Sequence, residues 1–425
     1  MNTGEQALPV ANTGPTTAQL PLDSATEAGT LSPSSTPVPQ ERFRARWYLA
    51  FKSVLPVYIC THLVFFVLTY LATLFIVGNF SPQILRVSML AHFWFRWDSG
   101  QFTYIAVHGY SAAWRTAFFP LFPLLEGIPT LLIHQIDPFL TGLVIASIAD
   151  LGMLMVLYRL VQQDFGQERA ERAVLYLSVF PTAFFLVAAY NESLFLFLAL
   201  LSFYQMRQGK WWLAGLAGFL ASLTRSVGVL LLIPFCYEYL RQHAFKLKAV
   251  RFDCISGLCI PAGLALFACY CFLRFHDVLA FSHAQSIGWK RQLQFPWVGL
   301  NNAWRVMSQN GMLSFNSVHN AIDVGALLLM LLLVVCCFVG PWKFSPEQRS
   351  YAFYAAGLYL FLLLFPSADT FPLQSLSRLI LEVFPAFLVL AAMGKNRQFY
   401  LYYLVLSVSL LSFMLLQFLS GHWIV

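Results

Sequence analysis

The chain has 425 residues, of which 59% are hydrophobic and only 11% are charged. An average soluble domain carries about 25% charged residues, so this composition excludes a soluble protein of this size and predicts one embedded in lipid. The formal net charge is +7, but the basic residues are spread over short loops between apolar stretches, as membrane topology requires, and this excludes a nucleic-acid partner.

The chain is predicted to consist of a tail and one membrane domain. Residues 1–46 form the predicted disordered cytoplasmic tail, because they are rich in Thr, Pro, Ser, Ala and Gly and lack the apolar run of a signal peptide. Residues 47–425 form the predicted all-α domain, since lipid offers no partner for open backbone groups. Eleven apolar stretches are predicted to cross the bilayer: 55–78, 138–161, 173–189, 192–206, 211–224, 226–240, 253–274, 321–340, 350–366, 376–394 and 399–420.

Two of the connecting loops are long, at about residues 78–137 and 275–319. Loops of this length are uncommon unless they are functional. The first contains an amphipathic piece, residues 120–135, that is predicted to lie in the membrane interface as short helices. With a cytoplasmic N-terminus, 17 of the 26 Lys and Arg residues fall on the cytoplasmic side, as the positive-inside rule demands. Both long loops then lie on the extracytoplasmic face.

The same threading places many polar residues at the extracytoplasmic boundary, although they come from segments far apart in the sequence. Ionisable residues close to apolar spans are costly, and they usually face a cavity with a function. We therefore expect these side chains to form one pocket: Arg96, Trp97, Asp98, Tyr104, His108, Tyr190, Asn191, Glu192, Arg225, His283, Gln285, Trp289, Ser375 and Arg378.

Three of these residues suggest a chemistry. Asp98 is a candidate general base, since a carboxylate near a pocket can take a proton from a hydroxyl. Arg225 and Arg378 are candidate anion binders, because guanidinium stays charged and suits phosphate. This set fits transfer of a group from a lipid phosphate. The sequence contains no metal motif, P-loop or GxGxxG, so a soluble nucleotide cofactor has no visible site.

Several of these residues have ordinary structural interpretations. Asp98 beside Arg96 is also what a simple interfacial ion pair requires. Glu192 suits the first turn of a helix, where the helix dipole favours a negative charge. Arg225 could extend from a helix end toward water, and Trp97 could be an interfacial anchor. A lone histidine is more often a hydrogen-bonded polar residue than a catalyst.

The segment FRWDSGQFTYIAVHGY at residues 95–110, followed by AFFPLFPLL at 117–125, resembles the signature of PIG-V-type mannosyltransferases. The similarity spans about residues 47–395. Three further segments agree with the family in order: FPTAFFLVAAYNESLF (180–195), ASLTRSVGVLL (221–231) and LSRLILEVFPAFLVL (376–390).

The resemblance implies a GT-C-type bundle and an inverting transfer from a polyprenyl-phosphate sugar, typically mannose. The acceptor would be a lipid-linked or glycan hydroxyl on the extracytoplasmic face. Asp98 would be the catalytic carboxylate, and Arg225 and Arg378 match family positions. The acidic pair of some GT-C loops is missing, because Ser99 and Gly100 follow Asp98. No motif requires a divalent metal, and metal use stays open.

The overall character of the sequence and its cytoplasmic tail suggest a bacterial plasma-membrane relative, in which a GPI anchor would not be the acceptor. Two non-enzymatic alternatives stay open. A lipid or glycolipid transporter could hold a phosphate headgroup with the same arginines, although the polar residues gather on one face and no half-repeat is visible. A structural scaffold would explain the spans but not Arg225 or the long loops.

Overall fold

The structure is a computed structural model that describes residues 39–76, 87–133, 135–311 and 313–422. Every regular element in these residues is a helix, and the β contact is an isolated antiparallel bridge between Arg291 and Ser367. The α-helices are α1 (Pro39–Ile76), α2 (Val87–His92), α3 (Asp98–His108), α4 (Leu121–Leu132), α5 (Pro138–Phe165), α6 (Gln167–Ser178), α7 (Glu192–Arg207), α8 (Trp211–Thr224), α9 (Leu232–Gln242), α10 (Cys259–Phe275), α11 (Ala280–Trp289), α12 (Val298–Asn310), α13 (Phe315–Phe338), α14 (Arg349–Leu364), α15 (Leu376–Leu379), α16 (Phe384–Met393) and α17 (Arg397–Leu419). Short 3₁₀ helices join several of them: η1 (Ala113–Ala117), η2 (Ala183–Leu186), η3 (Ser226–Leu231), η4 (Leu247–Ala249), η5 (Phe252–Leu258), η6 (Pro346–Gln348) and η7 (Ile380–Glu382).

The predicted all-helical membrane fold is confirmed. Among the described residues, five helical stretches are long and apolar enough to cross a bilayer, and a bent pair provides a sixth. A span needs about 20 mostly apolar residues, and these stretches meet that length. The protein is therefore an integral membrane protein. The five stretches are Arg44–Leu74, Pro138–Phe165, Phe252–Phe275, Phe315–Phe338 and Arg397–Leu419.

The predicted count of eleven spans is not confirmed. Helices α7, α8, α9 and α14 occur where spans are predicted, but they have 16, 14, 11 and 16 residues. The predicted span 173–189 is interrupted, because α6 ends at Ser178 before η2 begins. The predicted span 376–394 is the bent pair, whose two parts meet at 83°. Hydropathy locates the apolar segments, but it does not register breaks inside them.

Polar residues mark where the long helices begin. Asp137 precedes α5, and its side chain accepts a hydrogen bond from the backbone N–H of Phe139 at 2.9 Å. Ser314 caps α13 and Asn396 caps α17 in the same way. Such a cap pairs a backbone donor that the helix itself leaves unsatisfied. These residues therefore explain the start points that hydropathy leaves loose.

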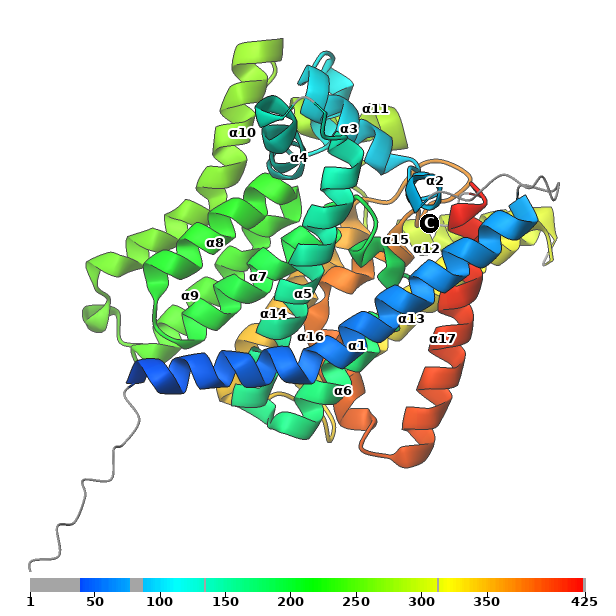
Figure 1. The fold of residues 1–425 in the computed structure, drawn as a ribbon. Coiled ribbons are helices and arrows are strands. Elements are labelled where there is room, and N and C mark those ends of the chain that lie inside the picture. Colours follow the sequence, from blue (N-terminus) through cyan, green and yellow to red (C-terminus); the bar gives the residue numbers. More distant parts are fainter. Residues whose placement is uncertain (1–38, 77–86, 134, 312, 423–425) are drawn as a thin grey trace, which may run out of the picture. The chain divides into compact units, whose positions relative to one another are not determined.

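The core of the membrane domain is built around α5, α7 and α16. Figure 1 shows α7 beside α5 and α8, and α8 in turn packs against α10. Helix α16 packs against α6, α13 and α14 and is almost wholly buried. From Ala45 onward, α1 contacts α5 through the Tyr58 hydroxyl, which donates a hydrogen bond to the Ser147 carbonyl oxygen at 3.1 Å.

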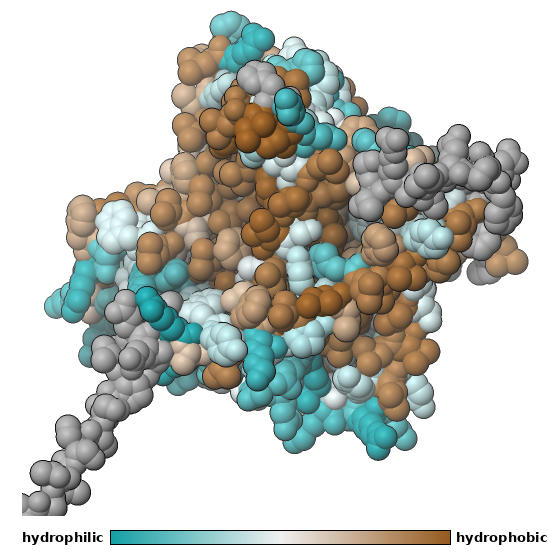
Figure 2. Space-filling model, viewed as in Figure 1, coloured by the Kyte–Doolittle hydropathy of each residue, from teal (hydrophilic) through white to brown (hydrophobic). Residues whose placement is uncertain are grey.

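The outer helices present apolar side chains to their surroundings. Leu63 of α1, Leu273 of α10, Leu332 of α13 and Val405 of α17 are all exposed. Figure 2 shows apolar residues over the middle of one face, with hydrophilic residues gathered at its lower margin. This arrangement is that of a protein whose surrounding medium is lipid. Most of the predicted tail, residues 1–38, lies outside the described residues, and residues 39–46 belong to α1.

Candidate active site

Breaks in the helices bring four charged residues together. Asp98 is the first residue of α3, and Glu192 is the first residue of α7. Arg225 is extended, with φ −154° and ψ 145°, between α8 and η3. Arg378 belongs to the four-residue helix α15. The site is therefore built from helix ends and breaks, where a side chain can project beyond the packed helix faces.

A glycine makes the break at Arg225 possible. The chain turns back onto α8 through η3, and a Cβ atom on Gly228 would lie 2.5 Å from the Ser222 nitrogen and 2.6 Å from the Ala221 carbonyl carbon. Those neighbours are backbone atoms, which cannot rotate away as a side chain can. Any larger residue would push η3 off α8 and displace Arg225.

A continuous series of ion pairs joins five side chains, here named the pocket cluster: Asp98, Arg378, Glu192, Arg225 and Glu382. Arg378 Nη1 lies 2.9 Å from Asp98 Oδ2, and Arg378 Nε lies 3.0 Å from Glu192 Oε1. Arg225 Nη1 lies 2.9 Å from the same Glu192 oxygen, and Arg225 Nε lies 3.0 Å from Glu382 Oε1. Since a lone buried carboxylate would be very costly, these pairings hold the acids in place.

The cluster fixes Asp98 firmly. The Arg378 guanidinium carbon lies 5.2 Å from the ring centres of both Phe185 and Tyr190. The Tyr190 hydroxyl donates a hydrogen bond to the carbonyl oxygen of Arg96 at 3.0 Å, two residues before Asp98. No described residue hydrogen-bonds the second carboxylate oxygen of Asp98, Oδ1. That oxygen is therefore the one available to a bound molecule.

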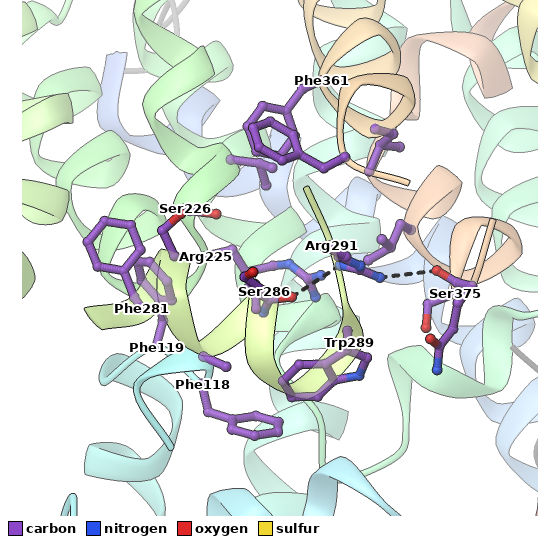
Figure 3. Close-up of a pocket in the computed structure, with 18 of the residues that line it drawn as sticks. Phe118, Phe119, Arg225, Ser226, Phe281, Ser286, Trp289, Arg291, Phe361 and Ser375 are labelled. Carbon is purple, nitrogen blue, oxygen red and sulfur yellow. Dashed lines mark hydrogen bonds between the residues drawn. The ribbon is translucent and has the colours of Figure 1, made fainter. Parts of the chain in front are cut away.

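A cavity of about 560 Å³ lies beside the pocket cluster. Asp98, Arg225, Arg378 and Glu382 line it, and so do the aromatic residues Phe118, Phe119, Phe281, Phe361 and Phe365. Figure 3 shows rings on separate sides of the cavity, with Arg225 and Arg291 between them. The cavity thus combines a charged region with apolar walls, as an amphipathic ligand requires.

One face of α11 supplies a polar wall. Ser282, Gln285, Ser286 and Trp289 have the spacing i, i+3, i+4, i+7, which places them on a single helix face. All four line the cavity, and Figure 3 shows two of them, Ser286 and Trp289. Hydroxyl and amide groups can exchange hydrogen bonds with sugar hydroxyls, and an indole offers an apolar surface. This wall is suited to a carbohydrate.

Arg291 is a third guanidinium in the cavity. It donates hydrogen bonds to the carbonyl oxygen of Gln374 at 3.1 Å and to Gln285 Oε1 at 3.4 Å. Both acceptors are neutral, and Arg291 forms no ion pair with any carboxylate in the described part of the chain. Burial and the charges of Arg378 and Arg225 lower the pKa of Arg291 to about 10, while the negative charge of Asp98 partly offsets this effect. The side chain is still a cation at neutral pH, in a place that favours an anion.

The cavity contains eight of the predicted site residues. They are Asp98, Asn191, Arg225, His283, Gln285, Trp289, Ser375 and Arg378. Tyr190 and Glu192 lie behind this lining and hold the arginines. His283 Nδ1 also donates a hydrogen bond to Asp277 Oδ2 at 2.7 Å, and this contact lowers the pKa of Asp277.

The remaining four predicted residues also lie outside the cavity lining. The Arg96 guanidinium donates to the carbonyl oxygen of Leu419 at 2.7 Å. Trp97 has a φ of 41° at the start of α3, and its ring lies 5.3 Å from that of Phe418. The rings of Tyr104 and His108 stack on each other at 4.6 Å. Arg96 and Trp97 thus support the segment before Asp98, whereas the Tyr104–His108 pair lies further along α3.

Two of the structural alternatives are wrong in this structure. Asp98 forms its ion pair with Arg378 and not with Arg96, whose guanidinium binds a backbone carbonyl. The Arg225 side chain is only 16% exposed and is paired with two carboxylates, so it does not extend toward water. Glu192 satisfies both interpretations, since it begins α7 and also binds the arginines.

Two residues of the site, Glu382 and Arg291, are not among those predicted from the sequence. Glu382 lies inside a predicted span, and an ionisable residue in an apolar run is itself a signal. Arg291 follows Lys290 in a polar loop, where nothing local marks it. Across the described ranges, no three His, Cys, Asp or Glu side chains gather so as to hold a metal ion. Metal dependence stays an open prediction.

Comparison with known proteins decides the family. The model of the family described as Mannosyltransferase (PIG-V) matches residues 75–294, which is more than half of the chain. The chain belongs to the PIG-V mannosyltransferase family. The matched range includes Asp98, Glu192, Arg225 and Arg291 and ends before Arg378. The predicted family resemblance is confirmed within this range.

Curated relatives of the PIG-V family show the same similarity. The mouse (Mus musculus) protein named GPI alpha-1,6-mannosyltransferase 2 is 31% identical over 199 residues, covering 42% of this chain and 40% of that protein. GPI mannosyltransferase 2 of Yarrowia lipolytica is 33% identical over 99 residues, covering 23% of this chain and 28% of that protein. The matches to these relatives thus span less than half of their length. Both relatives are named as mannosyltransferases, so the transporter alternative gains no support.

Solved structures resemble this PIG-V family chain only distantly. ArnT from Cupriavidus metallidurans aligns with a TM-score of 0.46 and 15% identity, over 75% of this chain and 61% of that one. The oligosaccharyltransferase of Archaeoglobus fulgidus aligns with a TM-score of 0.47 and 12% identity, over 87% of this chain and 56% of that one.

Proposed function

We propose that this PIG-V family protein is an inverting mannosyltransferase. It moves a mannosyl residue from a polyprenyl-phosphate-linked donor to the hydroxyl of a lipid-linked or glycan acceptor. One observation carries the proposal: a carboxylate with a free oxygen, Asp98, lies in the same cavity as three guanidinium groups and a carbohydrate-suited wall. The family names a mannosyl transfer, and the apolar walls and cations support a lipid phosphate as the leaving group.

The reaction that fits this geometry is a single displacement. The acceptor hydroxyl loses its proton to Asp98 Oδ1 as its oxygen bonds to the anomeric carbon. The bond from that carbon to the phosphate oxygen breaks at the same time, and the electron pair leaves with the polyprenyl phosphate. Attack opposite the leaving group inverts the anomeric configuration. Since phosphate is a good leaving group, no general acid is required.

The positions of the side chains suggest which residues orient the base, bind the sugar and stabilise the leaving phosphate. The ion pair with Arg378 orients Asp98, and the α11 wall can bind the sugar hydroxyls. Guanidinium groups facing the cavity stabilise charge that grows on the phosphate as it leaves. The donor's hydrocarbon chain is accommodated by the apolar walls around Phe361 and Phe365.

We further propose that the active site faces the extracytoplasmic side and the N-terminus the cytoplasm, which the distribution of basic residues supports. Bacterial origin stays a prediction. The acceptor is defined only as a lipid-linked or glycan hydroxyl, although the curated relatives carry GPI in their names.

Purified protein in nanodiscs tests the function. It is supplied with polyprenyl-phosphate mannose, polyprenyl-phosphate glucose or GDP-mannose, each with a panel of glycolipid acceptors, and the release of polyprenyl phosphate or GDP is measured. We expect release from polyprenyl-phosphate mannose that depends on the acceptor. The proposal is contradicted if GDP-mannose is the only donor that is used, or if none of the three donors is used.

A further inference from the structure

The three arginines of the cavity differ in what they already bind. Arg378 gives two of its nitrogens to Asp98 and Glu192, and Arg225 gives two to Asn191, Glu192 and Glu382. Among the described residues, the Arg291 side chain binds only a backbone carbonyl and an amide oxygen. The cavity therefore contains two neutralised guanidinium groups and one that is not neutralised.

The charges of the cavity lead to the same distinction. The two arginines of the pocket cluster face three carboxylates, so the cluster alone repels an anion. With Arg291 included, three positive charges stand against three negative ones. Among the described residues, Arg291 is the arginine of the three that forms no ion pair with a carboxylate. A phosphate that entered near Arg225 or Arg378 alone would meet Glu192 and Glu382 close behind them. At Arg291 it would meet a cation whose hydrogen-bond partners in the described part of the chain are both neutral.

The backbone at Arg291 is held in place. Lys290 adopts the left-handed conformation, with φ 52°, which ends α11 and turns the chain back along the cavity. Arg291 then forms a bridge with Ser367, and the Gln292 N–H donates to the carbonyl oxygen of Pro366 at 3.4 Å. The Ser367 hydroxyl donates to the Trp289 carbonyl oxygen at 2.8 Å. Guanidinium groups placed in advance bind anions at a smaller entropic cost.

We infer that Arg291 is the residue that binds the phosphate of the lipid-linked donor, and that Arg225 and Arg378 are positioning residues that hold Glu192, Glu382 and Asp98. This inference rests on the proposed function, because it names the group that receives the donor's charge. It reverses the sequence-based assignment of the phosphate to Arg225 and Arg378. In this division, Arg291 sets donor affinity and Arg378 sets the rate of transfer.

Direct binding tests Arg291 without requiring turnover. A short-chain polyprenyl phosphate and the matching uncharged polyprenol are titrated into detergent-purified protein by isothermal calorimetry. Arg291→Gln should weaken polyprenyl phosphate binding roughly 10- to 100-fold, as expected for a lost hydrogen bond to a charged group. Polyprenol binding should not change. Lys290→Gln is the matched control, because Lys290 is exposed, pairs with Asp369 at 3.1 Å and is not among the lining residues. It should leave both affinities within about twofold.

Further variants keep the test decisive. Arg291→Lys retains a charge but not the planar fork, so it should bind with intermediate affinity even if Arg291→Gln folds poorly. Arg378→Lys should lower kcat while donor KM stays near that of the wild type. The inference is overturned if Arg291→Gln binds polyprenyl phosphate as the wild type does, if it loses polyprenol equally, or if the wild type binds no polyprenyl phosphate. Arg291-dependent binding without any transfer would instead contradict the proposed function and leave this inference standing.

Discussion

The two ends of α7 carry two buried charge clusters that resemble each other closely but differ in their surroundings. Glu192 at the first residue belongs to the pocket cluster. Arg207 at the last residue, about 22 Å away along the helix axis, belongs to a far cluster with Asp164, Glu238 and Arg241. Arg207 lies 2.9 Å from Asp164 and 3.1 Å from Glu238, and its side chain is 10% exposed.

The difference lies in what the charges have left to bind. In the far cluster two arginines meet two carboxylates, and the Tyr351 hydroxyl donates a further hydrogen bond to Asp164 at 2.7 Å. None of its four members lines the cavity. The pocket cluster faces the cavity, retains a free oxygen on Asp98 and has the unpaired Arg291 nearby. A buried ion cluster is thus evidence of a functional site only where a cavity and an unmet charge accompany it.

The largest expected effect is a loss of transfer activity when the pocket cluster is changed at Asp98. Asp98→Asn keeps the shape of the side chain but removes the base, so we expect the rate of mannosyl transfer to fall about 10²- to 10⁴-fold. The midpoint of thermal unfolding in detergent should change little, since the amide oxygen can still accept from Arg378. Near-normal transfer by this variant in nanodiscs would show that Asp98 is not the base.

The second effect belongs to the far cluster and concerns stability. Arg207→Gln leaves Asp164 and Glu238 buried without their cation, and breaking a buried pair costs about 3–5 kcal/mol. We expect a clear fall in the thermal midpoint and normal kcat and KM for the protein that remains folded. If kcat fell while the midpoint held, the far cluster would be functional and the distinction between the clusters would fail.

A substitution at Gly228 should disturb the pocket cluster through the packing of η3 against α8. Gly228→Ala places a methyl group against the backbone of Ser222 and Ala221, and such overpacking costs typically 1–3 kcal/mol. The thermal midpoint and the rate of transfer should both fall, because Arg225 shifts with η3. Gly325→Ala is the control, since no atom lies within 4 Å of its Cβ position in α13. Equal effects from both substitutions would contradict the packing argument.

The smallest effect tests the support of Asp98. Tyr190→Phe keeps the ring beside Arg378 but removes the hydrogen bond to Arg96, which is worth about 1 kcal/mol. Transfer should slow a few-fold. Tyr359→Phe removes a comparable bond, from the Tyr359 hydroxyl to the carbonyl oxygen of Leu327 at 3.0 Å, away from the cavity. Tyr359→Phe should lower the thermal midpoint by a similar amount without slowing transfer. If Tyr359→Phe slowed transfer as much as Tyr190→Phe does, the effect at Tyr190 would not show that its hydrogen bond supports Asp98.

Local composition predicted the helical membrane fold and singled out the polar residues around Asp98, because the fold follows from apolar runs and the site from polar residues beside them. The helix that begins at Asp98 was not predicted. Local composition also indicated that Arg225 and Arg378 share a site with Asp98. It did not predict that carboxylates already occupy both arginines. Partners such as Glu192 and Arg378 lie 186 positions apart in the sequence, and only folding sets their distance. Arg291 was missed for the same reason: its importance is that none of the described carboxylates forms an ion pair with it.

The central claim is that one cavity places the donor phosphate at Arg291 and the anomeric carbon within reach of Asp98. An experimental structure with a non-hydrolysable phosphonate analogue of polyprenyl-phosphate mannose tests it most directly. The account predicts the phosphonate against the Arg291 guanidinium, the mannose along the Ser282–Trp289 face of α11 and Asp98 Oδ1 facing the sugar. An analogue bound outside this cavity, or with its phosphonate remote from Arg291 and its sugar remote from Asp98, would contradict the account.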